Sequence, residues 1–289
     1  MTQSHPPFRR LFDAHAHIVA DDAAAYPPSP ISGRVREGAL DDPMTVERLL
    51  VEMDTHGVDR AALVQRAHIY GYDNSYVVDA AARYPDRFRA ICVIDSTGPG
   101  AAARAIDWLG RGAAGIRLTE PSRDAAGDWL HGPQAREVWD AIAAHGGSIS
   151  VQLYGWNRTA RLAEMPALLA NYPHVPVIVE HLSNIVETPD APDHGIDADL
   201  AALAAFANVA LKLTTINLGR CRGNGVDARA VVARVAALFT PERLLWGSDV
   251  AQSLETYAEM TAMARSSVEA LSGEAQDLVL HATAKRLFG

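Results

Sequence analysis

Residues 11–17 read Leu-Phe-Asp-Ala-His-Ala-His, an apolar run that ends in two histidines two positions apart. In an extended strand, side chains at positions i and i+2 point to the same side. His15 and His17 therefore face one way, while Ala16 faces the other. The run predicts a buried strand whose end presents two imidazoles to one ion or one substrate.

Seven further apolar runs follow along the chain, and amphipathic stretches rich in Ala and Leu separate them. The predicted strands are 11–15, 60–65, 88–95, 115–119, 148–153, 175–181, 209–214 and 244–249. The predicted helices are 44–56, 74–84, 101–109, 134–145, 157–171, 197–207, 227–239 and 252–271. Strands that alternate with helices and are apolar on both faces are typical of a parallel sheet. Eight such units in 289 residues predict one (β/α)8 TIM-barrel domain over residues 1–289.

The predicted loops are unequal in length, since helix-to-strand links are short and several strand-to-helix links are long. The long links are the proline-rich 18–43, then 120–133, 182–196 and 215–226. Long loops on one face are typical of a barrel that builds its site at the carboxyl ends of the strands. We expect 18–43 to form a partial lid and 273–287 to form a C-terminal helix that packs on the barrel.

Three histidines and one carboxylate end three of the predicted strands: His15 and His17 at strand 1, His181 at strand 6 and Asp249 at strand 8. Neutral imidazole with carboxylate suits Zn²⁺, and a catalytic zinc keeps one position open for water. The other polar residues at strand ends are Gln65, Asp95, Arg117, Glu120, Gln152, Tyr154, Glu180, Lys212, Thr214 and Thr215. If the barrel prediction is right, these side chains share one pocket.

The chain resembles the amidohydrolase superfamily, and most closely its amidohydrolase family 2 branch, which includes lactonases for pyrone dicarboxylate, sulfomuconolactone and sugar acids. The motifs that carry the resemblance are Phe-Asp-Ala-His-Ala-His, Val-Glu-His at 179–181 and Leu-Leu-Trp-Gly-Ser-Asp at 244–249. Gln65 and the segments 71–74, 90–95 and 115–118 are similar to the lactonases in particular.

The resemblance implies a role for each site residue. Asp249 would take a proton from the attacking water, and the three histidines would hold a metal or polarise the substrate carbonyl. Arg117 would pair with a substrate carboxylate, which suits its planar fork. Further substrate contacts are expected from Gln65, His68, Asn74 and Tyr154. The metal ligands would be His15, His17, His181 and Asp249, with Glu120 as a further candidate.

The sequence also departs from the family pattern. Metal-dependent members carry a histidine at the end of strand 5, where this chain has Gln152-Leu153-Tyr154. Strand 4 has no lysine for carbamylation, which argues against two metals. Leu182-Ser183-Asn184 follows His181 where the pyrone-dicarboxylate lactonases have an arginine, and Val250-Ala251 follows Asp249. These departures argue against the pyrone dicarboxylate as substrate, and they leave open one Zn²⁺ or no metal.

We therefore expect a hydrolase that opens a small carboxylated lactone with water activated by Asp249. One alternative is a metal-dependent, non-oxidative decarboxylase of an aromatic acid, and another is a non-catalytic barrel that binds small acids. A serine triad fits poorly, because Ser248 directly precedes Asp249 on a strand and no Gly-x-Ser-x-Gly segment is present. A glycosidase pair of Asp95 and Asp249 would leave the histidines without a purpose.

Composition restricts the partners. The net charge of −9 and the pI near 5.6 argue against a nucleic-acid or anionic-membrane surface. No apolar run reaches 18 residues, and no signal peptide is evident. We expect a cytoplasmic protein with a small-molecule substrate, a homo-oligomer remaining possible. Cys92 lies in an apolar run and is expected to be a buried free thiol.

Overall fold

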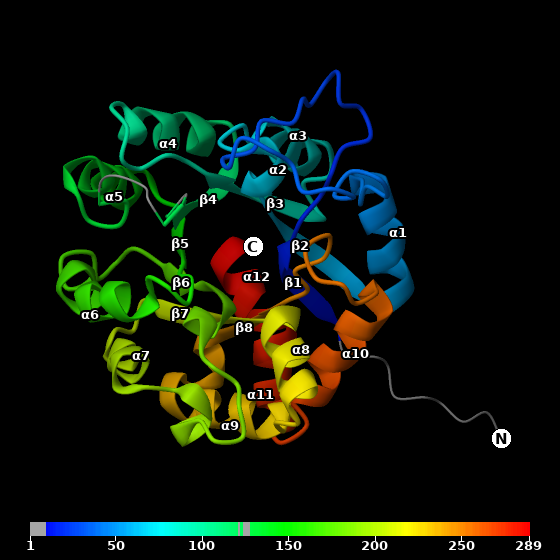
Figure 1. Cartoon of the computed structure of the whole chain (residues 1–289), viewed down its shortest axis with the longest axis vertical. Helices are drawn as coiled ribbons and strands as arrows, with labels where there is room; N and C mark the ends of the chain where they lie inside the picture. Colours follow the sequence, from blue (N-terminus) through cyan, green and yellow to red (C-terminus); the bar gives the residue numbers. More distant parts are fainter. Residues whose placement is uncertain (1–9, 121, 124–127) are drawn as a thin grey trace.

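The computed structural model describes residues 10–120, 122–123 and 128–289. Within these residues, eight parallel strands follow one another around a barrel in chain order (Figure 1). The strands are β1 (Leu11–Ala16), β2 (Val58–Val64), β3 (Phe88–Val93), β4 (Ala113–Thr119), β5 (Ser148–Gln152), β6 (Val177–Val179), β7 (Val209–Thr214) and β8 (Leu244–Gly247). The sheet closes where the Asp249 N–H donates to the His15 carbonyl oxygen at 2.7 Å and Ala16 bridges to Val250. The predicted (β/α)8 barrel is confirmed.

Most helices surround the barrel on the outside, while α12 lies at the centre of the view (Figure 1). In the described part of the chain they are α1 (Val46–His56), α2 (Ala67–Tyr70), α3 (Ser75–Arg83), α4 (Ala101–Gly110), α5 (Pro133–His145), α6 (Arg158–Leu169), α7 (Ala198–Ala202), α8 (Thr215–Asn224), α9 (Ala228–Phe239), α10 (Tyr257–Ser267), α11 (Gly273–Asp277) and α12 (Thr283–Phe288). Shorter segments are η1 (Glu180–Asn184), η2 (Pro192–Gly195), η3 (Leu203–Ala205), η4 (Pro241–Arg243) and the single π-turn η5 (Leu278–Ala282). Each predicted helix has a counterpart, with ends that differ by a few residues or more.

One predicted loop is wrong, because residues 215–226 contain α8. Thr214 and Asn217 form a capping box at its start, in which the Thr214 N–H donates to Asn217 Oδ1 at 3.2 Å. Gly225, with a φ of 69°, ends the helix. The segment is rich in glycine and arginine and has little apolar periodicity, so its helical nature depends on the cap and on packing. The predicted loop 120–133 lies partly outside the described residues.

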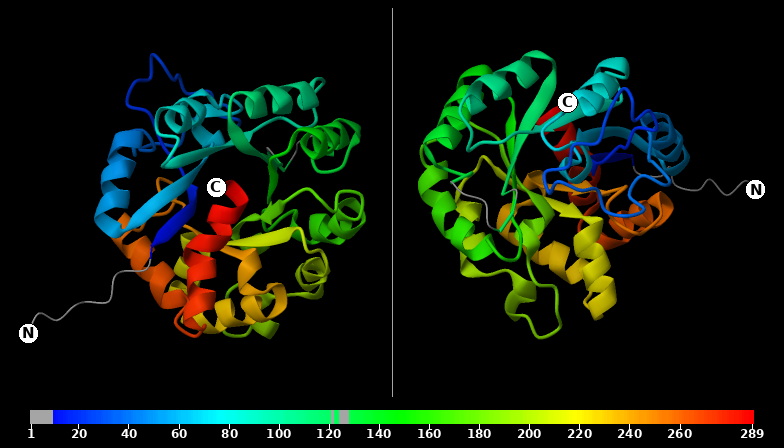
Figure 2. Two further views of the ribbon diagram at one scale, coloured as in Figure 1. Left: turned by 180° about the vertical axis from the view of Figure 1, so that it is seen from behind. Right: turned by 45° about the horizontal axis from the view of Figure 1, so that its top comes forward.

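The C-terminal segment closes one end of the barrel. Ala284 and Phe288 of α12 pack against barrel-lining side chains that include Phe12 and Ala14. Seen from behind, the red C-terminal helix lies across that end (Figure 2). The predicted terminal helix at 273–287 corresponds to α11, η5 and α12. Because this end is filled with apolar side chains, the polar residues gather at the opposite end, where the strands terminate.

Two smaller predictions can also be compared with the structure. Cys92 and Cys221 are both buried, and neither forms a disulfide within the described residues. The expected free thiol at Cys92 is therefore confirmed. No helix in the described part of the chain is long and apolar enough to cross a membrane.

Candidate active site

An irregularity in β1 turns the two histidines into the barrel. Phe12 and Ala14 face the barrel interior, yet His15 also faces inward, because the pairing of β1 with β2 shifts between Asp13 and Ala16. The buried Asp13 carboxylate holds this shift by accepting hydrogen bonds from the N–H groups of His15 (3.0 Å) and Ser248 (2.8 Å). Its second oxygen accepts from the Tyr257 hydroxyl at 3.0 Å. Burial raises the pKa of Asp13, against the lowering effect of these donors.

His17 and Asp249 meet at the mouth of the barrel. His17 Nδ1 lies 2.7 Å from the Val64 carbonyl oxygen, so Nδ1 carries a proton and donates to that oxygen, and Nε2 faces the site. That Nε2 lies 3.2 Å from His15 Nε2 and 3.3 Å from Asp249 Oδ1. His15 Nε2 lies 3.4 Å from the same carboxylate oxygen. Three potential ligand atoms therefore converge on one point.

His181 and Asp249 both follow a strand, although the sequence predicted them as the last residues of strands 175–181 and 244–249. β6 ends at Val179 and β8 ends at Gly247. His181 and Asp249 have φ values of 53° and 58°, in the left-handed region that non-glycine residues rarely adopt. Such conformations cluster at functional sites, where the surrounding structure holds them.

Hydrogen bonds around His181 fix its ring. Its Nδ1 lies 2.8 Å from Thr214 Oγ1, and its carbonyl oxygen accepts from Asn217 Nδ2 at 3.0 Å. Burial lowers the pKa of His181 to about 4, although the charges of Asp249 and Glu180 oppose this. The imidazole is therefore neutral at ordinary pH, with Nε2 left to face the site.

A buried charge cluster lies next to the histidines, and its member Arg117 reaches the cavity. Glu180 Oε2 is 2.6 Å from Arg117 Nε, and Glu180 Oε1 is 3.1 Å from Lys212 Nζ. Burial alone would raise the pKa of Glu180, but Arg117 and Lys212 hold it well below its usual range. Burial lowers the pKa of Lys212, against the attraction of Glu180. With Asp249 ionised, the buried cations Arg117 and Lys212 balance the buried anions Glu180 and Asp249.

His15 connects this cluster to the mouth of the barrel. Its Nδ1 lies 3.2 Å from Lys212 Nζ, a donor, and 3.4 Å from Glu180 Oε1, an acceptor. Either tautomer of the ring therefore has a partner. The His15 side chain is fully buried and stands behind His17 and His181 rather than at the cavity surface.

The donor set fits a metal ion. Among the described residues, two groups could hold one: His15, His17 and Asp249, or His15, Glu180 and His181. A tetrahedral ion with ligands at about 2.0–2.1 Å separates them by about 3.3 Å. The separations in the first group are 3.2, 3.3 and 3.4 Å. The second group fits less well, because both Glu180 oxygens already face cations. Glu120 belongs to neither group.

A cavity of about 190 Å³ opens above Asp249. His17, His181, Asp249, His68, Arg117, Glu120 and Tyr154 line it, all of them predicted site residues. Two predicted substrate contacts lie elsewhere. The Asn74 amide bonds to the N–H and carbonyl of Val93, at 2.7 and 3.0 Å, and so fixes the end of β3. Gln65 is buried and donates to the Asp73 carbonyl oxygen.

Further polar contacts lie around the cavity, some made by predicted residues and some by residues without a prediction. On one wall, Thr119, Gln152 and Tyr154 form a hydrogen-bonded triangle, and Asn157 Nδ2 donates to Glu120 Oε2 at 2.6 Å. On the other side, Arg66 follows β2, and Arg220 of α8 donates to Asn184 Oδ1 at 2.9 Å. Asn184, three residues after His181, thus positions a guanidinium from a different element.

The whole arrangement can be compared with known families. The family model described as amidohydrolase matches residues 12–289. The chain belongs to the amidohydrolase family. The branch expected from the sequence motifs is thereby confirmed. No curated protein matches this amidohydrolase.

Solved structures with the same fold are distant in sequence. A probable 2-pyrone-4,6-dicarboxylic acid hydrolase from Acinetobacter baumannii, with citric acid bound, has 20% identity and a TM-score of 0.73, covering 97% of this chain and 99% of its own. An amidohydrolase from Burkholderia multivorans with bound zinc has 18% identity and a TM-score of 0.73, covering 96% and 99%.

A third such structure belongs to a different reaction class. It is 5-carboxyvanillate decarboxylase from Novosphingobium aromaticivorans, complexed with manganese and a nitrobenzoic acid. It has 14% identity and a TM-score of 0.68, covering 97% of this chain and 96% of its own. At these identities the likeness establishes the shared fold alone.

Proposed function

We propose that this amidohydrolase is a lactonase that opens a small carboxylated lactone. The observation that carries the proposal is the placement of Asp249, a buried carboxylate at the floor of a cavity that also presents the guanidinium groups of Arg66, Arg117 and Arg220. Although burial opposes it, a hydrogen bond from His17 and the positive charges that His15, His17 and His181 carry when protonated hold the pKa of Asp249 well below its usual range. An ionised carboxylate is what a general base requires.

In the proposed reaction, a water molecule between Asp249 and the lactone carbonyl carbon loses a proton to Asp249 as its oxygen bonds to that carbon. The negative charge that develops on the carbonyl oxygen is stabilised from the His181 and Arg117 side of the cavity. The ring C–O bond then breaks, and the proton on Asp249 passes to the departing alkoxide. Lactone and water thus give one hydroxy acid, and Asp249 is regenerated. Ser253, which donates to Asp249 Oδ2 at 3.0 Å, keeps Oδ1 directed at the histidines.

We also propose that His15, His17 and Asp249 hold one divalent ion, with Zn²⁺ as the first candidate. Their spacing supports this, and so does the zinc in the Burkholderia multivorans amidohydrolase. A bound ion would lower the pKa of a coordinated water and polarise the carbonyl. Elemental analysis of purified protein tests the site: about one equivalent is expected in the wild type and almost none in His17→Asn. Equal metal content in both proteins would refute it.

A lactone panel on protein of known metal content tests the activity. We expect hydrolysis of at least one carboxylated lactone, followed in a pH-stat, and a loss of at least about 100-fold in Asp249→Asn. Arg83→Gln, an exposed change on α3, is the matched control and should keep full activity. An unchanged rate in Asp249→Asn would exclude the mechanism.

The second candidate function is decarboxylation of an aromatic acid, because the chain shares its fold with 5-carboxyvanillate decarboxylase. Adding hydroxybenzoates to the panel distinguishes this function from lactone hydrolysis. Release of CO2 from hydroxybenzoates that stops on chelation, without lactone hydrolysis, would replace the lactonase proposal. Binding of acids without any turnover would instead favour the non-catalytic barrel.

A further inference from the structure

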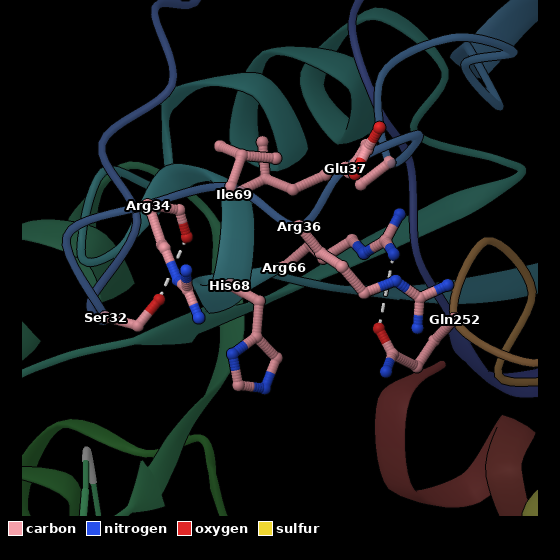
Figure 3. Close-up of a pocket in the computed structure, with 10 residues that line it drawn as sticks. Ser32, Arg34, Arg36, Glu37, Arg66, His68, Ile69 and Gln252 are labelled. Atoms are coloured by element: carbon pink, nitrogen blue, oxygen red, sulfur yellow. Dashed lines mark hydrogen bonds between the residues drawn. The ribbon is translucent and has the colours of Figure 1, made fainter.

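A second cavity, of about 620 Å³, lies directly outside the first. We call this second cavity the outer cavity. Residues 32–39 of the loop between β1 and α1 form its outer wall. Arg66, His68 and Gln252 line both cavities, so these side chains lie at the border between the two spaces. Figure 3 shows the Arg34 guanidinium on one side of His68, and those of Arg36 and Arg66 on the other side, near Gln252.

The loop that forms this wall is fastened to the barrel. The N–H groups of Ser29 and Ile31 donate to the carbonyl oxygens of Ile69 and Ala67, at 2.8 and 3.3 Å. Val35 and Ala39 pack on a small buried cluster made by Val19, Ile69 and Tyr70. Because Val35 packs against this cluster, Arg34 and Arg36 on either side of it are presented at the wall of the cavity.

The guanidinium groups of the outer cavity outnumber the carboxylates in its described lining. Arg34, Arg36 and Arg66 have no carboxylate within 4.0 Å among the described residues, and Glu37 is the single described carboxylate in the lining. Three guanidinium groups are thus gathered in a chain whose net charge is −9. The gathering calls for an anion from outside the protein.

Arg66 is the member that joins the two cavities. Its Nη2 donates to Gln252 Oε1 at 3.2 Å, while its Nε is buried and has no acceptor among the described residues. Burial lowers the pKa of Arg66, and the nearby charge of Asp249 opposes this while that of Arg36 adds to it. Arg66 therefore lies within electrostatic reach of both the general base and the outer arginines.

We propose that the outer cavity, through Arg34, Arg36 and Arg66, binds a second anionic group at the far end of the substrate. The substrate class is then an elongated lactone that carries a carboxylate or a phosphate-type group remote from the ring. This inference rests on the proposed function, which places the reacting ring in the inner cavity above Asp249.

Calorimetric titration with product-like acids tests the inference without any turnover. The probes are α,ω-dicarboxylates from succinate to suberate, compared with monocarboxylates of the same length. We expect the dicarboxylate that best spans the two cavities to bind about tenfold more tightly than its monocarboxylate. That advantage should disappear in Arg34→Gln/Arg36→Gln, two exposed positions outside the catalytic residues. It should persist in Arg83→Gln/Arg229→Gln, which removes two exposed charges from α3 and α9.

Three results overturn the outer site: no dicarboxylate advantage at any length, an advantage that survives in Arg34→Gln/Arg36→Gln, or equal loss in both double variants. A parallel series with one end replaced by phosphonate identifies the group, since tighter binding than the carboxylate assigns a phosphate-type end and weaker binding assigns a carboxylate. A dicarboxylate preference in a protein without lactonase activity would overturn the proposed function alone. Lactone hydrolysis without the preference would overturn the outer site alone.

Discussion

Replacing Glu180 by glutamine should destabilise the protein strongly, because this carboxylate is the one that neutralises Arg117 and Lys212 in the buried cluster. Glu180 is fully buried, 2.6 Å from Arg117 Nε and 3.1 Å from Lys212 Nζ. At an effective dielectric constant of about 20, each unit-charge attraction at about 3 Å is worth about 5 kcal/mol. Glutamine avoids the cost of burying the carboxylate, which offsets part of this loss. Since two buried cations would then face Asp249 as the one remaining anion of the cluster, we expect a loss of about 3–5 kcal/mol in the free energy of unfolding.

A double-mutant cycle with Lys212→Met isolates the charge effect. Lys212→Met should cost less than Glu180→Gln, because Glu180 keeps Arg117 as its partner. The double variant should be more stable than the sum of the single losses by at least about 2 kcal/mol, since the charge imbalance is removed. Urea unfolding followed by circular dichroism and by tryptophan fluorescence measures all four proteins. A Glu180→Gln loss below about 1 kcal/mol, or strict additivity in the cycle, would refute the reasoning.

Three further perturbations test other contacts. In metal-free protein, lowering the His181 pKa from 6.5 to about 4 is worth about 3 kcal/mol of unfolding free energy. Because the fold favours the neutral ring, this contribution is complete above pH 6.5, decreases as the pH falls from 6.5 to 4, and is lost below pH 4. The midpoints of urea unfolding across that pH range measure it. His181→Asn should flatten the plot of unfolding midpoint against pH. Asn74→Ala should lower the free energy of unfolding by about 1–3 kcal/mol and leave KM unchanged, because the Val93 N–H and carbonyl lose their partner. A raised KM at unaltered stability would instead make Asn74 a substrate contact. Asp13→Ala should lower the free energy of unfolding by at least about 2 kcal/mol, because three donors lose their acceptor. It should also lower the metal content, because the turn that directs His15 is released. A change in stability alone would show that Asp13 does not position His15.

Local pattern was sufficient for the barrel and for much of the site. Alternating apolar runs and helices predict eight parallel units, and the strand-end rule then brings His17, His181, Arg117 and Asp249 to one face. The prediction works because each unit is specified by its own periodicity. It failed at α8, where the helix depends on its capping box and on packing rather than on an apolar stripe.

Only the tertiary structure decided which polar side chains face the cavity and which bond to the backbone. Asn74 and Gln65 were expected at the substrate, yet their amides satisfy backbone groups, and no sequence pattern records which partner an amide finds. The β1 irregularity held by Asp13, and the left-handed turns at His181 and Asp249, also depend on contacts between segments far apart in the chain.

The sequence by itself therefore determined the fold, the face that carries the site and the residue types available for chemistry, because these follow from periodicities of 2 and 3.6 residues within single elements. The tertiary structure decided the pairing of Glu180 with Arg117 and Lys212, and the gathering of Arg34, Arg36 and Arg66 around one cavity. Charges act through space, so their partners are set by the folded chain and not by their order along it.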